Sequence, residues 1–153
     1  MRNLKTQVWK FKDSISRAEF VALLVRALDI KPIPTEYDIA FSDVDSSSWY
    51  YDYVIAASSN GIVGGADGMF RPNDTITREE MCKMLVIASG NTAEEAELTF
   101  TDKDRIGDWA TTYVAKAVSM GLMNGMDDGS FNPKGNALRE QAFAVIYRIL
   151  ELK

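Results

Sequence analysis

The chain of 153 residues contains no histidine and only one cysteine, Cys82. The absence of histidine excludes His-based catalytic triads, His-zinc sites and histidine pH switches. A single cysteine excludes an intrachain disulfide and any metal site built from several thiolates. No apolar run reaches the roughly 18 residues that a transmembrane helix needs. We therefore expect no metal, no other cofactor and no membrane span.

Basic residues are also too few for a typical nucleic-acid-binding protein, because the net charge is −5. Hydrophobic residues make up 46% of the chain and charged residues 25%, which is close to ordinary globular usage. The first twenty residues lack the apolar segment of a secretory signal. We expect either an intracellular protein or a fragment of an exported one.

One short motif occurs three times, and its arginines Arg17, Arg78 and Arg139 are spaced by 61 residues. The motif reads Ser-Arg-Ala-Glu, then Thr-Arg-Glu-Glu, then Leu-Arg-Glu-Gln. Longer segments upstream of the second and third copies repeat as well, and each ends in Asp-Gly-x-Phe-x-Pro. The sequence predicts a single compact module over residues 1–153, with a partial repeat at 1–30 and full repeats at 31–90 and 91–153.

Each arginine is expected to begin a central helix, because apolar residues follow at helical spacing. In the first copy these are Phe20, Leu23, Leu24, Ala27 and Leu28. Arm helices are expected over about 48–60 and 108–120, each stopped by a glycine. The predicted fold is all-α, with three central helices packed about a pseudo-threefold axis and two projecting arm helices.

The ordered pattern Phe-x-Asp, Trp, Gly, Asp-Gly-x-Phe-x-Pro and Thr-Arg-x-Glu resembles the S-layer homology domain family. Residues 41–90 and 100–151 resemble whole repeats, and residues 9–30 resemble the closing half of another. The resemblance implies a non-catalytic module that binds a bacterial secondary cell wall polysaccharide, usually one with pyruvylated sugars. It also implies an extracellular, wall-associated location, so that this chain would be a fragment without its signal peptide.

The three arginines are the first candidates for ligand binding. Each is expected at the first position of a helix, where the helix dipole disfavours a cation. Arginine together with free N–H groups at a helix start forms a site for a carboxylate, such as that of a pyruvate ketal. The alternative is a structural salt bridge to a neighbouring repeat.

Trp49 and Trp109 are the next candidates, because an indole ring can stack on a sugar; the alternative is that they anchor the core. The resemblance extends the candidate ligand-binding set to motif residues and loop glycines, namely Ser16, Thr77, Glu19, Glu80, Gly65 and Gly125. The pairs Asp43/Asp45 and Asp102/Asp104 could suggest calcium binding, but turn and cap roles are favoured, because the twelve-residue calcium loop with its terminal glutamate is absent.

Two other functions remain open. A self-assembly module is the main alternative, because three arginine sites but only two arm helices predict two formed grooves and one that is open or filled by another chain. An enzyme would need a carboxylate pair. Since no acidic pair stands out, we expect no catalytic activity.

Overall fold

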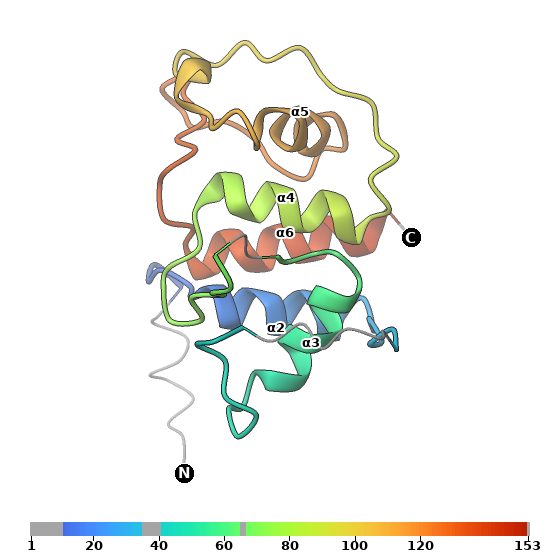
Figure 1. The fold of residues 1–153 in the computed structure, drawn as a ribbon. Helices are drawn as coiled ribbons and strands as arrows, with labels where there is room; N and C mark the ends of the chain where they lie inside the picture. The colour runs from blue at the N-terminus through green and yellow to red at the C-terminus, as the bar shows by residue number, and fades with distance from the viewer. Residues whose placement is uncertain (1–10, 35–40, 65–66, 153) are drawn as a thin grey trace.

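The computed structural model describes residues 11–34, 41–64 and 67–152, and it is helical. Its α-helices are α2 (Arg17–Ala27), α3 (Tyr51–Ser59), α4 (Arg78–Ala88), α5 (Thr111–Ser119) and α6 (Arg139–Glu151), with a short 3-10 helix, η1 (Lys103–Arg105). Within these ranges β-pairing is limited to three isolated bridges. Figure 1 shows α2, α4 and α6 at the centre and the arm helices α3 and α5 outside them. The predicted all-α fold is confirmed.

Two of the central helices begin with the predicted capping boxes. Ser16 and Thr77 each accept a hydrogen bond from a backbone N–H three residues later, and Glu19 and Glu80 accept one from the cap residue's own N–H. At the third helix Gln141 accepts from the Leu138 N–H at 2.9 Å. Leucine has no oxygen to complete the box, so α6 begins with half of the capping interaction.

A closed ring of three backbone hydrogen bonds joins the starts of the central helices. The Ile15 N–H donates to the Ala137 carbonyl at 3.1 Å, the Ala137 N–H donates to Ile76 at 2.9 Å, and the Ile76 N–H donates to Ile15 at 3.0 Å. All three residues are almost completely buried. The pseudo-threefold axis passes through this ring, which pairs backbone groups that burial would otherwise leave unsatisfied.

A second set of backbone hydrogen bonds, outside the ring, follows the same pseudo-threefold symmetry. The N–H groups of Arg17, Arg78 and Arg139 donate to the carbonyls of Asp74, Gly135 and Asp13, at 2.8–3.0 Å. The N–H group of each following residue donates to the carbonyl of Pro72, Pro133 or Phe11, each at 3.0 Å. Each helix start is therefore bonded to the loop of a neighbouring repeat.

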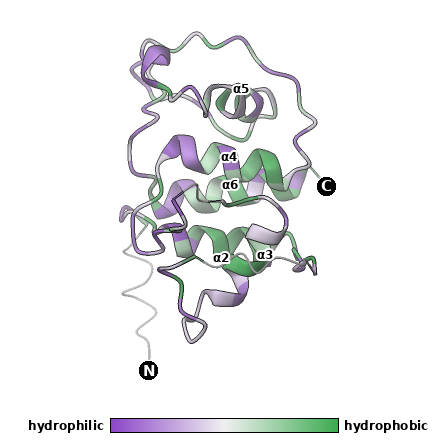
Figure 2. Ribbon diagram, viewed as in Figure 1, coloured by the Kyte–Doolittle hydropathy of each residue, from purple (hydrophilic) through white to green (hydrophobic). Residues whose placement is uncertain are grey.

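One apolar core runs through the repeats. Phe70 and Phe131, the aromatic residues of Phe-x-Pro, are 1% and 0% exposed and fill it between the helices. Figure 2 shows apolar residues concentrated along α2 and the second half of α4. Cys82 is also buried, and burial raises the pKa of its thiol to about 12, so that the thiol stays protonated and acts as a small apolar side chain.

The arm helices pack on the central ones, α3 against α2 and α5 against α4. Both are shorter than the expected 48–60 and 108–120, because the residues before them form turns in which Tyr51 and Ala110 donate to the carbonyls of Ser48 and Gly107. Gly61 and Gly121, with φ of 75° and 72°, adopt the left-handed conformation that ends a helix.

The outer face of α6 differs from those of α2 and α4. Phe143 and Tyr147 on this face are 45% and 65% exposed. Their counterparts in the 61-residue register are buried, namely Val21, Val25, Cys82 and Val86. Among the described residues no arm helix packs against α6 as α3 and α5 pack against α2 and α4. Phe11 packs edge-on against Phe143, with ring centroids 5.8 Å apart, and the rest of this apolar face is left open.

The incomplete cap of α6 gives a stability prediction. Leu138→Thr supplies the missing oxygen and should raise the free energy of unfolding by roughly 0.5–1 kcal/mol. Thr77→Leu, the reverse change at the matching position, should lower it by about the same amount. Urea denaturation of both variants measures this, and a destabilised Leu138→Thr protein would contradict it.

Candidate functional site

Several predicted site residues from three different repeats meet in one open pocket of about 640 Å³. Arg17 comes from α2, Thr77 and Glu80 from the start of α4, and Trp109 from the turn before α5. Residues 62–64, 67, 69, 71, 74 and 75 of the glycine loop, together with Lys83 and Met84 of α4, complete the described lining. We call this pocket the Trp109 groove. It lies between repeats.

Arg17 crosses from its own repeat to the next one. Its Nε donates to the Phe70 carbonyl at 2.9 Å, its Nη1 forms an ion pair with Glu80, and its guanidinium lies 5.2 Å from the centroid of the Phe70 ring. The side chain is 12% exposed. Arg17 thus holds the glycine loop against α4 and contributes a positive charge to the groove.

The other two arginines follow the same geometry with different partners. Arg139 donates two hydrogen bonds to the Glu19 carboxylate, one of them at 2.8 Å. Arg78 donates to the carbonyls of Phe131 and Asn124 at 2.8 and 2.7 Å. In the repeat register the carboxylate position facing Arg78 is occupied by Gln141, and no described carboxylate forms an ion pair with Arg78. Burial lowers the pKa of this arginine from its ordinary value.

The predicted salt bridges between repeats are therefore present for Arg17 and Arg139. The first-turn N–H groups of α2 and α4 are not free for an anion, because each already has an acceptor within the protein. The first two N–H groups of each central helix already donate to loop carbonyls, and in α2 and α4 the third donates to the cap hydroxyl.

Trp49 and Trp109 are not core anchors. They are 62% and 50% exposed, although each precedes a packed arm helix. The Trp109 indole is held close to the backbone, since a Cβ built on Gly107 would lie 2.8 Å from its Nε1. Trp49 packs edge-on against Tyr50, with ring centroids 5.3 Å apart. Both indoles leave ring surface for a ligand.

Two glycines, Gly65 and Gly125, were predicted to contribute to ligand binding. Gly65 lies outside the described residues, but its neighbour Gly64 lines the Trp109 groove. Gly125 is packed, because a Cβ there would lie 2.5 Å from the Phe100 ring. The structure thus gives Gly125 a packing role that the sequence did not indicate.

Asp43 and Asp102 cap the loops that carry Phe70 and Phe131. Asp102 accepts from the N–H groups of Phe131 and Asn132 at 2.8 and 2.9 Å, and Asp43 makes the matching pair of bonds. Burial acts to raise the pKa of Asp102, but these hydrogen bonds outweigh it and hold the pKa below its ordinary value. The turn-capping role favoured by the sequence is confirmed.

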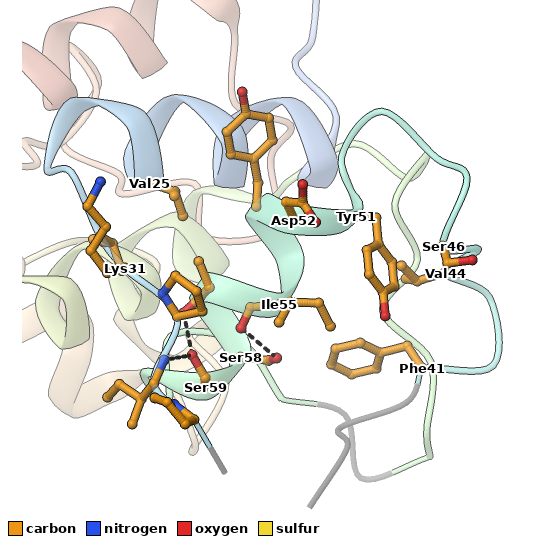
Figure 3. A pocket seen from close by; sticks show the side chains of 16 residues that line it. Val25, Lys31, Phe41, Val44, Ser46, Tyr51, Asp52, Ile55, Ser58 and Ser59 are labelled. Carbon is orange, nitrogen blue, oxygen red and sulfur yellow. Dashed lines mark hydrogen bonds between the residues drawn. The ribbon is translucent and has the colours of Figure 1, made fainter.

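A larger pocket of about 930 Å³ lies beside α3, under the connection after α2. Figure 3 shows Phe41, Tyr51 and Ile55 lining it, with Lys31 at one side. Lys31 is paired with Asp29 at 2.8 Å, and none of the predicted site residues lines this pocket. The Trp109 groove is therefore the candidate site.

Sequence reasoning missed four charged residues of this groove, namely Asp67, Arg71, Asp74 and Lys83. Lys83 lines it from α4, and its ammonium lies 5.7 Å from the centroid of the Trp109 ring. A signal was available, because the two register counterparts of Lys83 are Ala22 and Ala144. A single lysine where two repeats have alanine marks a chemical difference between otherwise similar grooves.

The repeats also match a known family. The model of the S-layer homology domain matches residues 40–82 and 99–143. The chain belongs to the S-layer homology domain family. The two matched segments correspond to the two full repeats, and the ring of hydrogen bonds shows that residues 11–30 supply the third central position.

Relatives are large proteins of which this chain matches a small part. An amylopullulanase of Thermoanaerobacterium thermosulfurigenes is 42% identical over 90% of this chain and 8% of its own length. A surface-layer 125 kDa protein of Lysinibacillus sphaericus is 36% identical over 88% and 11%. A cellulosome-anchoring protein of Acetivibrio thermocellus is 27% identical over 94% and 34%. The family is thus shared by enzymes and by surface proteins.

The two loop glycines give a matched pair of predictions. Gly125→Ala should destabilise the protein by roughly 1–3 kcal/mol, because its Cβ overpacks the Phe100 ring. Gly64→Ala should change stability by less than about 0.5 kcal/mol, since nothing lies within 4 Å of its added Cβ. Thermal and urea unfolding measure both, and equal effects would show that the loop packing is not as described.

Proposed function

We propose that this chain anchors the protein that carries it to the bacterial cell wall, by binding an acidic secondary cell wall polysaccharide in grooves between its repeats. The Trp109 groove is the observation that supports this most directly. It combines an exposed indole, arginine and a hydroxyl from three repeats in one pocket large enough for a sugar. The names of the surface-layer and anchoring relatives agree with such a role.

The geometry of the groove suits a sugar that carries a carboxylate. The exposed face of Trp109 can stack on the C–H groups of a sugar ring, as aromatic rings do on apolar surfaces. Arg17 commits Nε and Nη1 to the fold but no described residue accepts from its Nη2, which therefore remains available to a ligand oxygen. Binding of this kind needs no catalytic group.

The net charge of −5 makes local recognition necessary. The overall field repels an acidic polymer, so attraction has to come from cations held close to the ligand. The arginine positions between repeats and the exposed tryptophans supply such local contacts. We therefore place the chain outside the cell, associated with the wall or its surface layer, and expect neither nucleic-acid nor membrane-spanning partners. Among the described residues no helix is long and apolar enough to cross a bilayer.

Removing the indole tests the proposal. Trp109→Ala should lower affinity for purified cell walls by about 1–2 kcal/mol, as is usual for a central aromatic contact. It should leave stability nearly unchanged, because half of the side chain is exposed. The matched control is Tyr147→Ala, which removes an exposed aromatic from α6.

Co-sedimentation with purified walls, before and after chemical removal of the secondary polymer, measures this. Wild-type protein should lose binding when the polymer is removed. Equal binding by wild type and Trp109→Ala would exclude the Trp109 groove as the site. Equal binding to stripped walls would exclude the polymer as the ligand.

The open face of α6 favours self-association as a second candidate function. Phe143, Tyr147 and Leu150 are exposed there, and a second copy of the chain is the occupant that this hypothesis names. Sedimentation velocity at micromolar concentration should then show a dimer. Phe143→Glu combined with Tyr147→Glu should abolish it, whereas Trp49→Glu, on another face, should not. A monomeric wild-type protein would reject this candidate.

A further inference from the structure

Glu79 is a buried carboxylate that lies beside the Trp109 groove but does not line it. It follows the motif arginine in α4, and its side chain is 3% exposed. Its Oε2 accepts a hydrogen bond from the Gly107 N–H at 2.9 Å, and its Oε1 forms an ion pair with Lys134. Glu79 therefore joins the start of α4 to two separate segments of the last repeat.

The pseudo-threefold fold does not itself require a carboxylate at this position. The counterpart of Glu79 in α2 is Ala18, which is 1% exposed, so a methyl group fills the same place in the core. The counterpart in α6 is Glu140, whose side chain is 42% exposed and pairs with Lys12 at 3.3 Å. Burial of a carboxylate costs free energy, which only well-placed hydrogen bonds and an ion pair offset. What distinguishes Glu79 is the segment that it holds, the turn at Gly107.

This turn carries the indole of the groove. The Gly107 carbonyl accepts from the N–H groups of Ala110 and Thr111 at 2.8 and 3.1 Å, so both backbone polar groups of Gly107 are bonded. The Trp109 ring lies against the same residue, since a Cβ built on Gly107 would be 2.8 Å from the indole Nε1. A continuous series of contacts thus leads from Glu79 through the turn to a half-exposed indole.

The turn before the other exposed tryptophan, Trp49, contains its own acceptor. The N–H of Ser47, two residues before that indole, donates to the Asp45 carboxylate at 2.9 Å. In the turn before Trp109 the position of Asp45 is taken by Arg105, whose side chain has no acceptor. The N–H two residues before Trp109 therefore takes its acceptor from a different repeat.

We propose that Glu79 is a positioning residue, which holds the Gly107 turn and thereby fixes the Trp109 indole in the orientation that a ligand contacts. This rests on the proposed function, but it concerns the order of the indole and not the charge of the ligand. Because Glu79 is almost fully buried, it acts through the turn and does not touch the ligand. A side chain that is ordered before binding loses less conformational entropy when the ligand arrives.

The first measurement follows the indole without any ligand. Trp9→Phe together with Trp49→Phe leaves Trp109 as the sole tryptophan, and phenylalanine is what the other two repeats have at the position of Trp9. In this background Glu79→Ala should lower the fluorescence anisotropy of Trp109, because the Gly107 N–H loses its acceptor. Glu79→Gln keeps an acceptor oxygen and loses only the ion-pair charge, so it should retain most of the wild-type anisotropy.

The second measurement is co-sedimentation with purified cell walls, in protein that keeps all three tryptophans. Glu79→Ala should weaken binding by roughly three- to tenfold, which corresponds to the cost of ordering one side chain on binding. Glu79→Gln should bind nearly as well as wild type. Gly107→Ala keeps Glu79 but places a Cβ against the indole, so it should displace the ring and weaken binding as well. The matched control is Glu140→Ala, which removes the register counterpart and should change neither anisotropy nor binding.

Each outcome decides a separate point. Lower anisotropy together with weaker wall binding in folded Glu79→Ala protein supports the positioning role. A lower melting temperature with unchanged anisotropy and binding would overturn it and leave Glu79 a purely structural residue. Lower anisotropy with unchanged binding would overturn the link between indole order and affinity, while wall anchoring stood. Wild-type protein that failed to bind walls would overturn the proposed function, and the anisotropy would still decide whether Glu79 fixes the indole.

Discussion

The ring of hydrogen bonds among Ile15, Ile76 and Ala137 is the constraint on which the rest of the structure depends. Because the ring is closed, no repeat can move its helix start without breaking bonds to both of the others. The buried position leaves no water to replace a broken bond, so each loss has its full cost. The ring fixes where each helix begins, and it therefore determines which loop each motif arginine reaches.

This arrangement divides each sequence motif between two grooves. Arg17 meets Glu80 of the next motif, and Arg139 meets Glu19 of the first one. A change in the glutamate position of one motif consequently alters the groove that contains the arginine of a different motif. Gln141, in the third copy, lies at the position facing Arg78, whose charge therefore stays without a carboxylate partner and is partly desolvated. The grooves thus differ in charge although their backbones are equivalent.

The sequence was a good guide wherever the determining interactions are local. Apolar spacing predicted the central helices, capping boxes predicted their starts at Ser16 and Thr77, and the C′ glycines predicted where the arms end. It could not show that neighbouring loops occupy the helix-start N–H groups, because those bonds join residues far apart in the chain. The exposure of Trp49 and Trp109 and the packing of Gly125 on Phe100 depend on tertiary contacts for the same reason. The left-handed φ of 62° at Arg71, inside Phe-x-Pro, is not indicated by arginine itself, and its repeat counterpart Asn132, with φ of 58°, is the residue type that favours this conformation.

Along each central helix, the residues that fill the core are distinct from the residues that can change the charge of a groove. Residues that face the axis, such as Phe20, Met81 and Ala142, are completely buried and must fill fixed space. The position occupied by Ala22, Lys83 and Ala144 faces outward enough in α4 to accept a long charged side chain. A substitution there changes the charge of one groove without disturbing the hydrogen-bonded ring. Pseudo-threefold repetition therefore allows grooves with equivalent backbones to differ in charge through a single residue.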